Sequence, residues 1–141
     1  MSSGSCEHLT DLPPVVRLIL DEARRGAFAT VDAEGRPHVV PVCFATRGDE
    51  LISAIDHKPK TGKVMARVRH LEADPRATLM ADRWDEDWQR VGWVMVRGTA
   101  RLEAPLNVES LNARYAQYRD MPDHDALIVL RPEAILWWTW K

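Results

Sequence analysis

Short apolar segments alternate with tight polar turns, and this pattern limits the possible folds more than any other feature of the sequence. Residues 27–31 and 37–45 are joined by a short polar connection in which Gly35 can adopt a positive φ, so they predict a β-hairpin. A second polar turn at 47–49 leads to a third strand at 51–55. The early chain is therefore expected to form a three-stranded antiparallel meander.

Helical periodicity occurs in three places between the strands. It predicts a helix that Asp11 caps, that opens at Pro13 or Pro14 and that Gly26 ends, a basic helix that stops before Asp74-Pro75, and a third helix over 107–118. Further strands are expected at residues 77–81, 91–102, 127–130 and 135–140. Strands outnumber helices, which favours a mainly β fold with peripheral helices (α+β), built as an antiparallel barrel, over a doubly wound sheet.

The composition suits one globular domain spanning residues 1–141, because 45% of the residues are hydrophobic and 28% are charged. The net charge of −2 argues against nucleic acid or an anionic membrane as a partner. The sequence has neither a secretory signal nor the roughly 20 consecutive apolar residues of a membrane helix. Cys6 and Cys43 form no disulfide framework, so a cytoplasmic location with reduced thiols is expected.

The strongest candidate for a binding segment runs from residue 57 to residue 71, where five Lys and Arg residues occur without an acidic residue. The segment lies between a predicted strand end and a predicted helix start, where backbone N–H groups and cationic side chains can bind a phosphate or polycarboxylate group. A solvated basic helix face is the alternative interpretation. Pro59 stiffens the connection and favours the anion site.

A second candidate segment holds Trp84, Trp88 and Trp93 beside several carboxylates. Tryptophan packs in cores and interfaces and also stacks on flat rings, so both roles stay open for each of them. The carboxylates lack the spacing of a calcium loop, and the five histidines form no compact metal motif, so no metal site is expected. Motifs for a side-chain nucleophile, a dinucleotide or a P-loop are also absent, which favours a cofactor that brings its own reactivity.

Several motifs occur in a fixed order along nearly the full chain. They are residues 27–31, residues 35–42, residues 53–56, the Lys58-Pro59-Lys60 loop and Asp74-Pro75-Arg76. Together they resemble the flavin and deazaflavin split-barrel family related to pyridoxamine 5'-phosphate oxidase. The later run at 82–88, followed by Gly98, is similar to a subgroup assigned as F420-dependent enzymes. The resemblance implies an FMN-binding-protein-like split β-barrel that forms a homodimer with cofactor sites at the subunit interface.

The resemblance also implies which residues contact the cofactor. They are Val40, Pro41 and Val42 on the second strand, Ser53, Ala54, Ile55 and Asp56 at the end of the third, Lys58, Lys60, Lys63 and Arg67 in the basic loop and helix, and Trp88, with Arg90 and Trp93, from the partner chain. The sequence departs from the family pattern at His70, Trp84 and Gly92, where an asparagine, a tyrosine and a bulky aromatic residue are usual. No catalytic side chain is assigned.

The implied activity is hydride transfer between reduced F420 and a small electron-poor organic acceptor. The basic segment suits the oligoglutamate tail of F420, and it would also hold the phosphate of FMN. An FMN-binding oxidase or reductase of the same fold and a non-catalytic cofactor-binding protein are therefore the alternatives. An RNA-binding barrel is disfavoured by the net negative charge.

Overall fold

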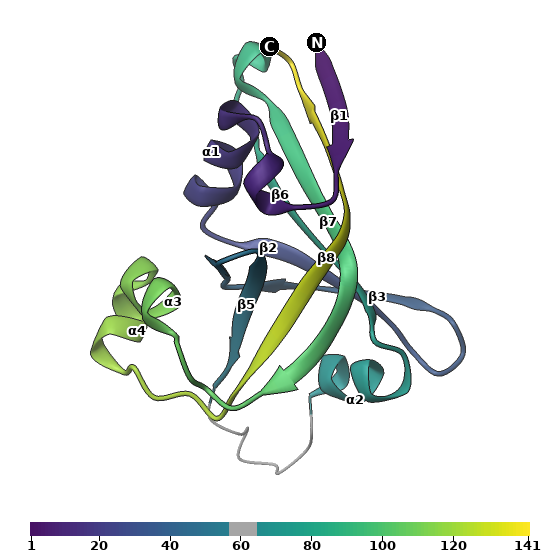
Figure 1. The fold of residues 1–141 in the computed structure, drawn as a ribbon, viewed down its shortest axis with the longest axis vertical. Helices are drawn as coiled ribbons and strands as arrows, with labels where there is room; N and C mark the ends of the chain where they lie inside the picture. The colour runs from purple at the N-terminus through teal and green to yellow at the C-terminus, as the bar shows by residue number, and fades with distance from the viewer. Residues whose placement is uncertain (57–64) are drawn as a thin grey trace.

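The chain folds mainly as one strongly bent antiparallel sheet with a few short helices beside it, as the computed structural model of residues 1–56 and 65–141 shows (Figure 1). The strands are β1 (Ser2–Cys6), β2 (Gly26–Val31), β3 (Pro37–Val42), β4 (Ala45–Arg47), β5 (Glu50–Ile55), β6 (Arg76–Arg83), β7 (Gly92–Glu103) and β8 (Ala126–Thr139). The helices are α1 (Pro14–Glu22), α2 (Ala66–Ala73), α3 (Glu109–Arg114) and α4 (Ala116–Asp120), with 3₁₀ turns η1 (Leu9–Asp11) and η2 (Trp88–Arg90).

The long β7–β8 pair joins the two halves of the sheet. The strand order is β3-β2-β6-β7-β8-β5-β4, and β1 also pairs with β8. One edge of β8 pairs with β7 along its length, and the other edge pairs with β5 near its start and with β1 near its end. The expected β2–β3 hairpin is confirmed, with Gly35 at a φ of 79°.

The expected three-stranded meander is wrong in its third member, because β5 pairs with β4 and β8 rather than with β3. Leu51 and Ile52 are neighbours on β5, and their side chains lie on opposite faces although both are fully buried. A strand buried on both faces needs cover on each face, and β5 has the main core on one face and the cluster with α3 and α4 on the other. β3 instead forms an exposed edge, on which Val39 is 60% exposed.

The main core lies on the inner face of the bent sheet. One row across β2, β6, β7 and β8 consists of Phe28, Leu79, Val96 and Ile135, each at most 2% exposed. Helix α1 adds Val16, Ile19 and Leu20. Val42 and Leu51 come from opposite ends of the strand order and still join this core, so the sheet curls around it.

A second core lies on the other face of β5 and β8, under α3 and α4. Ile52 and Val129 pack there with Leu111 and with Tyr115, which separates the two helices. The single helix expected over 107–118 is therefore wrong. Tyr115 is extended (φ −122°, ψ 127°), and its hydroxyl accepts from the Phe44 N–H at 3.0 Å and donates to the Phe44 carbonyl at 3.1 Å. These two buried hydrogen bonds hold Tyr115 in an extended conformation, so one continuous helix cannot form through it.

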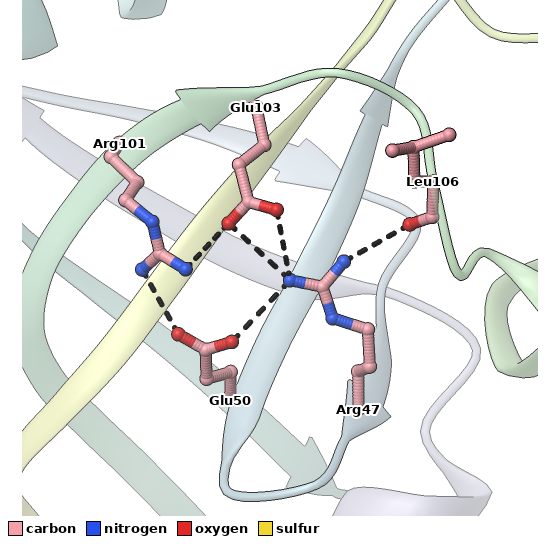
Figure 2. A network of polar contacts seen from close by, with 5 residues as sticks. All are labelled: Arg47, Glu50, Arg101, Glu103 and Leu106. Carbon is pink, nitrogen blue, oxygen red and sulfur yellow. Dashed lines mark hydrogen bonds and ion pairs between the residues drawn. The ribbon is translucent and has the colours of Figure 1, made fainter.

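Two arginines and two glutamates form a network of ion pairs beside the loop that precedes α3 (Figure 2). Arg101 pairs with Glu50 at 2.9 Å and with Glu103, while Arg47 lies 3.3 Å from both carboxylates. Arg47 also donates to the Leu106 carbonyl at 3.1 Å. Burial acts to raise the pKa of Glu50, but hydrogen bonds and charge from both arginines outweigh it and lower that pKa. The network thus ties β4, β5 and β7 to the chain entering α3.

Residues 126–139 form one strand rather than the two expected at 127–130 and 135–140. The β7–β8 register shifts between Arg97 and Gly98, and this irregularity accommodates Pro132 within the strand. A Cβ at Gly98 would lie 1.8 Å from the Arg131 carbonyl oxygen, so only glycine permits this close backbone approach.

The first helix begins at Pro14, which is one of its two expected starts, but its expected cap and C-terminal end are wrong. Asp11 ends η1, and α1 has no side-chain cap. The helix stops at Glu22, and Gly26 is the first residue of β2, paired with Val42. None of the helices in the described ranges is long and apolar enough to cross a membrane.

Candidate functional site

The ends of β3 and β5 contribute apolar side chains to one side of the bent sheet. Val40 and Ile55 are partly buried against the main core, and Val42 lies within it. Pro41 is exposed because it points to the opposite face from Val40 and Val42. Val40, Val42 and Ile55 therefore contact the main core, whereas Val40 and Pro41 together line a cleft of about 270 Å³ at β3.

Two further predicted residues on β5 already have structural roles. The Ser53 hydroxyl is buried and donates to the Cys43 carbonyl at 2.7 Å. Ala54 faces the second core, under α3 and α4. Neither side chain is available to a ligand in this arrangement.

Arg67 on α2 is the charged group that best fits an anion-binding role among the described residues. Its side chain is half-buried, and its Nε is a buried donor without a hydrogen-bond partner in the described part of the chain. Burial lowers the pKa of Arg67, while the nearby Tyr118 and Asp56 act in the opposite direction. Lys58, Lys60 and Lys63 lie outside the described residues, and their predicted role stays a prediction.

Asp56 follows β5 and lies in a hydrogen-bonded cluster. Its Oδ2 accepts from the Tyr118 hydroxyl at 3.0 Å, and its Oδ1 lies 2.9 Å from His124 Nδ1. His124 Nε2 lies 2.6 Å from Asn112 Oδ1, and the His124 side chain is fully buried. Burial, followed by the charge of Asp56, raises the pKa of Tyr118, so this phenol remains a proton donor. Asp56 is thus hydrogen-bonded directly to α4 and to the loop before β8. Asn112 on α3 in turn binds His124 of that loop.

Sequence reasoning missed Asn112, Tyr118 and His124. The cluster depends on the pairing of Ile55 with Ala126, which brings the loop before β8 alongside Asp56. The Asp125 N–H also donates to the Ile55 carbonyl at 2.9 Å. A signal was present in the polar run at 123–125 directly before an apolar strand, but it becomes informative only once that strand is paired with β5.

The predicted α2 helix is confirmed over Ala66–Ala73, and it ends with Asp74 as cap, directly before Pro75. His70, at the position where the family usually has asparagine, is hydrogen-bonded through Nδ1 to Thr30 Oγ1 at 2.8 Å. The His38 ring meets the His70 ring edge-on, with centroids 4.8 Å apart. These contacts connect the helix that carries Arg67 to β2 and β3.

Trp88 lies at the opposite end of the molecule from α2. It belongs to a cleft of about 310 Å³ lined by Trp84, Trp88, Val91, Trp93, Trp138 and Trp140. The Trp88 and Trp140 rings meet edge-on, with centroids 6.3 Å apart, and the C-terminal end lies at the top of Figure 1, whereas α2 lies at the bottom. Within one chain, the structure therefore does not bring Trp88 to Arg67.

The outer face of the sheet is the face opposite the main core, and it extends from this tryptophan cleft to β3. Successive strands place apolar side chains in one row there, namely Pro41, Ala27, Met80, Met95 and Leu136. Pro41 is exposed and the others are half-buried. Trp84 and Trp88 at one end are 69% and 59% exposed. Apolar exposure of this extent on one face is typical of a surface that meets a partner.

The described residues contain no group of three or more His, Cys, Asp or Glu side chains that could hold a metal ion. Within the described part of the chain, the buried side-chain nitrogens without a hydrogen-bond partner are Arg67 Nε, Arg114 Nε and His38 Nδ1, and the tryptophan-lined cleft lies at the other end of the molecule from Arg67.

Solved structures with the same fold include proteins of different described roles. A conserved hypothetical protein of Mycobacterium tuberculosis has a TM-score of 0.70 at 18% identity, with 87% of this chain and 81% of that chain covered. A FAD-binding protein of Mesorhizobium loti has a TM-score of 0.67 at 16% identity, with 97% of each chain covered. HutZ, the heme storage protein of Vibrio cholerae, has a TM-score of 0.64 at 23% identity, with 86% and 90% covered.

These identities establish likeness of fold. No curated protein matched the chain by sequence. The family model described as pyridoxamine 5'-phosphate oxidase, however, matches residues 12–139, which include every strand except β1. The bent antiparallel sheet, its flanking helices and this match together show that the chain belongs to the pyridoxamine 5'-phosphate oxidase family.

Proposed function

We propose that this protein is an F420-dependent oxidoreductase that acts as a homodimer on a small electron-poor organic acceptor. The observation that carries the proposal is the half-buried Arg67 guanidinium, whose buried Nε has no partner among the described residues. A buried donor without a partner is costly unless a ligand satisfies it. An anionic group on a cofactor would do so.

The described residues around the end of β5 fit a flavin-type cofactor. Such a molecule needs apolar walls for its ring system and a cationic group for its phosphate. Ile55 supplies partly exposed apolar surface at the end of β5, and Arg67, which is close enough to the adjacent Asp56 to be influenced by its charge, supplies the positive group. When bound in its reduced form, a deazaflavin supplies a hydride to an electron-poor carbon. The side chains of this chain would bind and orient the reactants.

The choice of F420 over FMN depends on the resemblance of residues 82–88 to the F420-dependent subgroup. The family match and a FAD-binding structural neighbour support a flavin-type cofactor in general. A structural neighbour that stores heme makes heme the ligand of a different class that has to be tested.

A homodimer would explain the apolar outer face and the distant tryptophans. An obligate interface buries roughly 2,000 Å² or more and is apolar at its centre. The row from Pro41 to Leu136, continued by Trp84 and Trp88, provides such a surface. A partner's Trp88 could then reach the site that contains Arg67, which one chain alone does not achieve.

Equilibrium titration of the purified protein with F420, FMN and hemin tests the proposal. We expect F420 to bind more tightly than FMN and hemin, and reduced F420 to be oxidised by an added electron-poor acceptor in stopped-flow absorbance. Tighter binding of FMN would favour the flavin alternative. Binding of F420 without turnover of any acceptor would favour a cofactor-binding protein, and tight binding of hemin alone would contradict the proposal.

A further inference from the structure

The hydrogen bonds around His124 determine where its protons lie. Asn112 Nδ2 donates to the Pro122 carbonyl at 3.1 Å, and this carbonyl can only accept. The amide oxygen of Asn112 must therefore face His124 Nε2, at 2.6 Å. Because an amide oxygen is an acceptor, Nε2 must carry a proton.

The other ring nitrogen of His124 faces a carboxylate. Nδ1 lies 2.9 Å from Asp56 Oδ1, while Asp56 Oδ2 already accepts from the Tyr118 hydroxyl. A carboxylate accepts at both of its oxygens, and Asp56 Oδ2 is already an acceptor, so the hydrogen bond at Oδ1 assigns a donor to Nδ1. His124 therefore donates from both nitrogens and is a fully buried imidazolium paired with Asp56.

Several charged or titratable groups surround the pair of His124 and Asp56. Tyr118 from α4 donates to Asp56, Arg67 on α2 lies near Asp56, and Cys43 lies near Tyr118. Asp56 is close enough to Arg67 to influence its pKa, yet the two form no ion pair in the described structure. The His124 imidazolium balances the Asp56 carboxylate, which leaves the positive charge of Arg67 uncompensated.

We propose that His124 is a positioning residue that binds Asp56 and thereby keeps Arg67 free for an anionic group of the cofactor. The role in binding rests on the proposed function, whereas the pairing itself does not. Without the imidazolium, the nearest cation able to compensate Asp56 would be Arg67. An ion pair between them would occupy the guanidinium and weaken the anion site.

Nitrogen-15 NMR of the histidine-labelled wild-type protein tests the pairing without any cofactor. We expect both His124 nitrogens to be protonated at pH 7, with Nδ1 and Nε2 each showing an attached proton. An unprotonated His124 nitrogen would overturn the proposal. His8 serves as the control in the same spectra, because its pair with Asp49 at 2.7 Å is solvent-exposed.

The Arg67 Nε–H signal tests the consequence for Arg67. We expect this signal to shift in His124→Gln, as Arg67 turns to Asp56, and to return in the double variant His124→Gln/Asp56→Asn, which lacks the carboxylate. An Arg67 signal that is the same in the wild type and in a folded His124→Gln would overturn the proposal. If His124→Gln does not fold, His124→Asn decides in its place, because it also lacks the cation and keeps Asp56, so its Arg67 signal should shift in the same way.

The affinity for F420 and FMN tests the role of His124 in cofactor binding. His124→Gln should weaken binding about tenfold. In the Arg67→Ala background the same substitution should change the affinity by less than about threefold, because the guanidinium that His124 keeps free is already absent. His8→Gln should leave the affinity unchanged. A loss of about tenfold from His124→Gln in both backgrounds would overturn the positioning role. If the wild type binds neither cofactor, the proposed function fails, and the NMR arms alone decide the pairing.

Discussion

The two ends of the molecule present opposite kinds of surface. At the α2 end, Asp56, Tyr118 and His124 satisfy one another through hydrogen bonds, and Arg67 Nε is a buried donor without a partner among the described residues. At the C-terminal end, Trp84 and Trp88 are more than half exposed around an apolar cleft. We propose that the first end binds a ligand by charge, whereas the second is suited to burial against a partner, because covering exposed aromatic rings is favourable. In the proposed homodimer, each end would supply what the other lacks.

Truncation of the exposed tryptophans should give the largest effect. In the double variant Trp84→Ala/Trp88→Ala, the dimer dissociation constant should rise about 30-fold or more, because buried interface tryptophans are typical hot spots worth about 2 kcal/mol or more. Sedimentation equilibrium measures this change. The thermal midpoint of the monomer should move little, since both rings are exposed within one chain. Val15→Ala, an exposed position on α1, is the control. A wild-type protein that is monomeric at micromolar concentration would contradict the proposed interface.

Removal of the guanidinium at the opposite end should weaken cofactor binding and preserve the fold. Arg67→Ala should lower the affinity for F420 by about tenfold to a hundredfold, because a charged hydrogen bond contributes roughly 1.5 to 3 kcal/mol. The free energy of unfolding should stay level or rise, since a half-buried donor without a partner is lost. Arg36→Ala is the matched control, because Arg36 is exposed and pairs with Asp32. Equal affinities for the wild type and Arg67→Ala would place the anion site elsewhere.

Tyr118 tests how strongly the polar cluster stabilises its end of the molecule. Tyr118→Phe removes one donor from Asp56 and should lower the free energy of unfolding by about 1 kcal/mol. The pKa of Tyr118 is raised in the folded state, so its contribution is present below the ordinary tyrosine pKa of about 10 and is lost as the pH rises above that value. Denaturant unfolding between neutral and alkaline pH should show this loss in the wild type and not in Tyr118→Phe. Parallel curves for the two proteins would refute the assignment.

Asp74, beside the end of α2, should give the smallest effect because its partner Arg76 is exposed and solvent screens the pair. Hydrogen bonds from Arg76 lower the pKa of Asp74 to about 2. Its contribution to stability is therefore present above pH 4 and is lost as the pH falls towards 2. Thermal midpoints of the wild type and Asp74→Asn should differ slightly at pH 6 and converge near pH 2. A difference that grows on acidification would show that the pair is not the cause.

Much of the fold could be predicted from the sequence, because strand and helix signals are local. The β2–β3 hairpin, α2 and the helix before β2 follow from periodicity and turn chemistry. The placement of β5 beside β8 does not, since it depends on burial of Leu51 and Ile52 on opposite faces. The break at Tyr115 likewise depends on a hydrogen bond to Phe44, 71 residues away in the sequence.

The candidate site could be predicted in part. Arg67 was identified from a local run of basic residues, and the structure adds the buried Nε that distinguishes it. Ser53 and Ala54 were identified through their neighbours in the motif, but their side chains are committed to Cys43 and to the second core. His124 was missed because its partners come from α3, α4 and β5, and sequence spacing cannot show which elements meet.

Mixed dimers test most directly whether the two ends meet across a subunit interface. If Arg67 of one chain and Trp88 of its partner form one site, then Arg67→Ala homodimers and Trp88→Ala homodimers are defective at both sites. A heterodimer of the two variants, purified with distinct affinity tags, would instead contain one doubly altered site and one intact site. We predict that it binds F420 with wild-type affinity at half the wild-type stoichiometry. A heterodimer with no site of wild-type affinity would contradict the account.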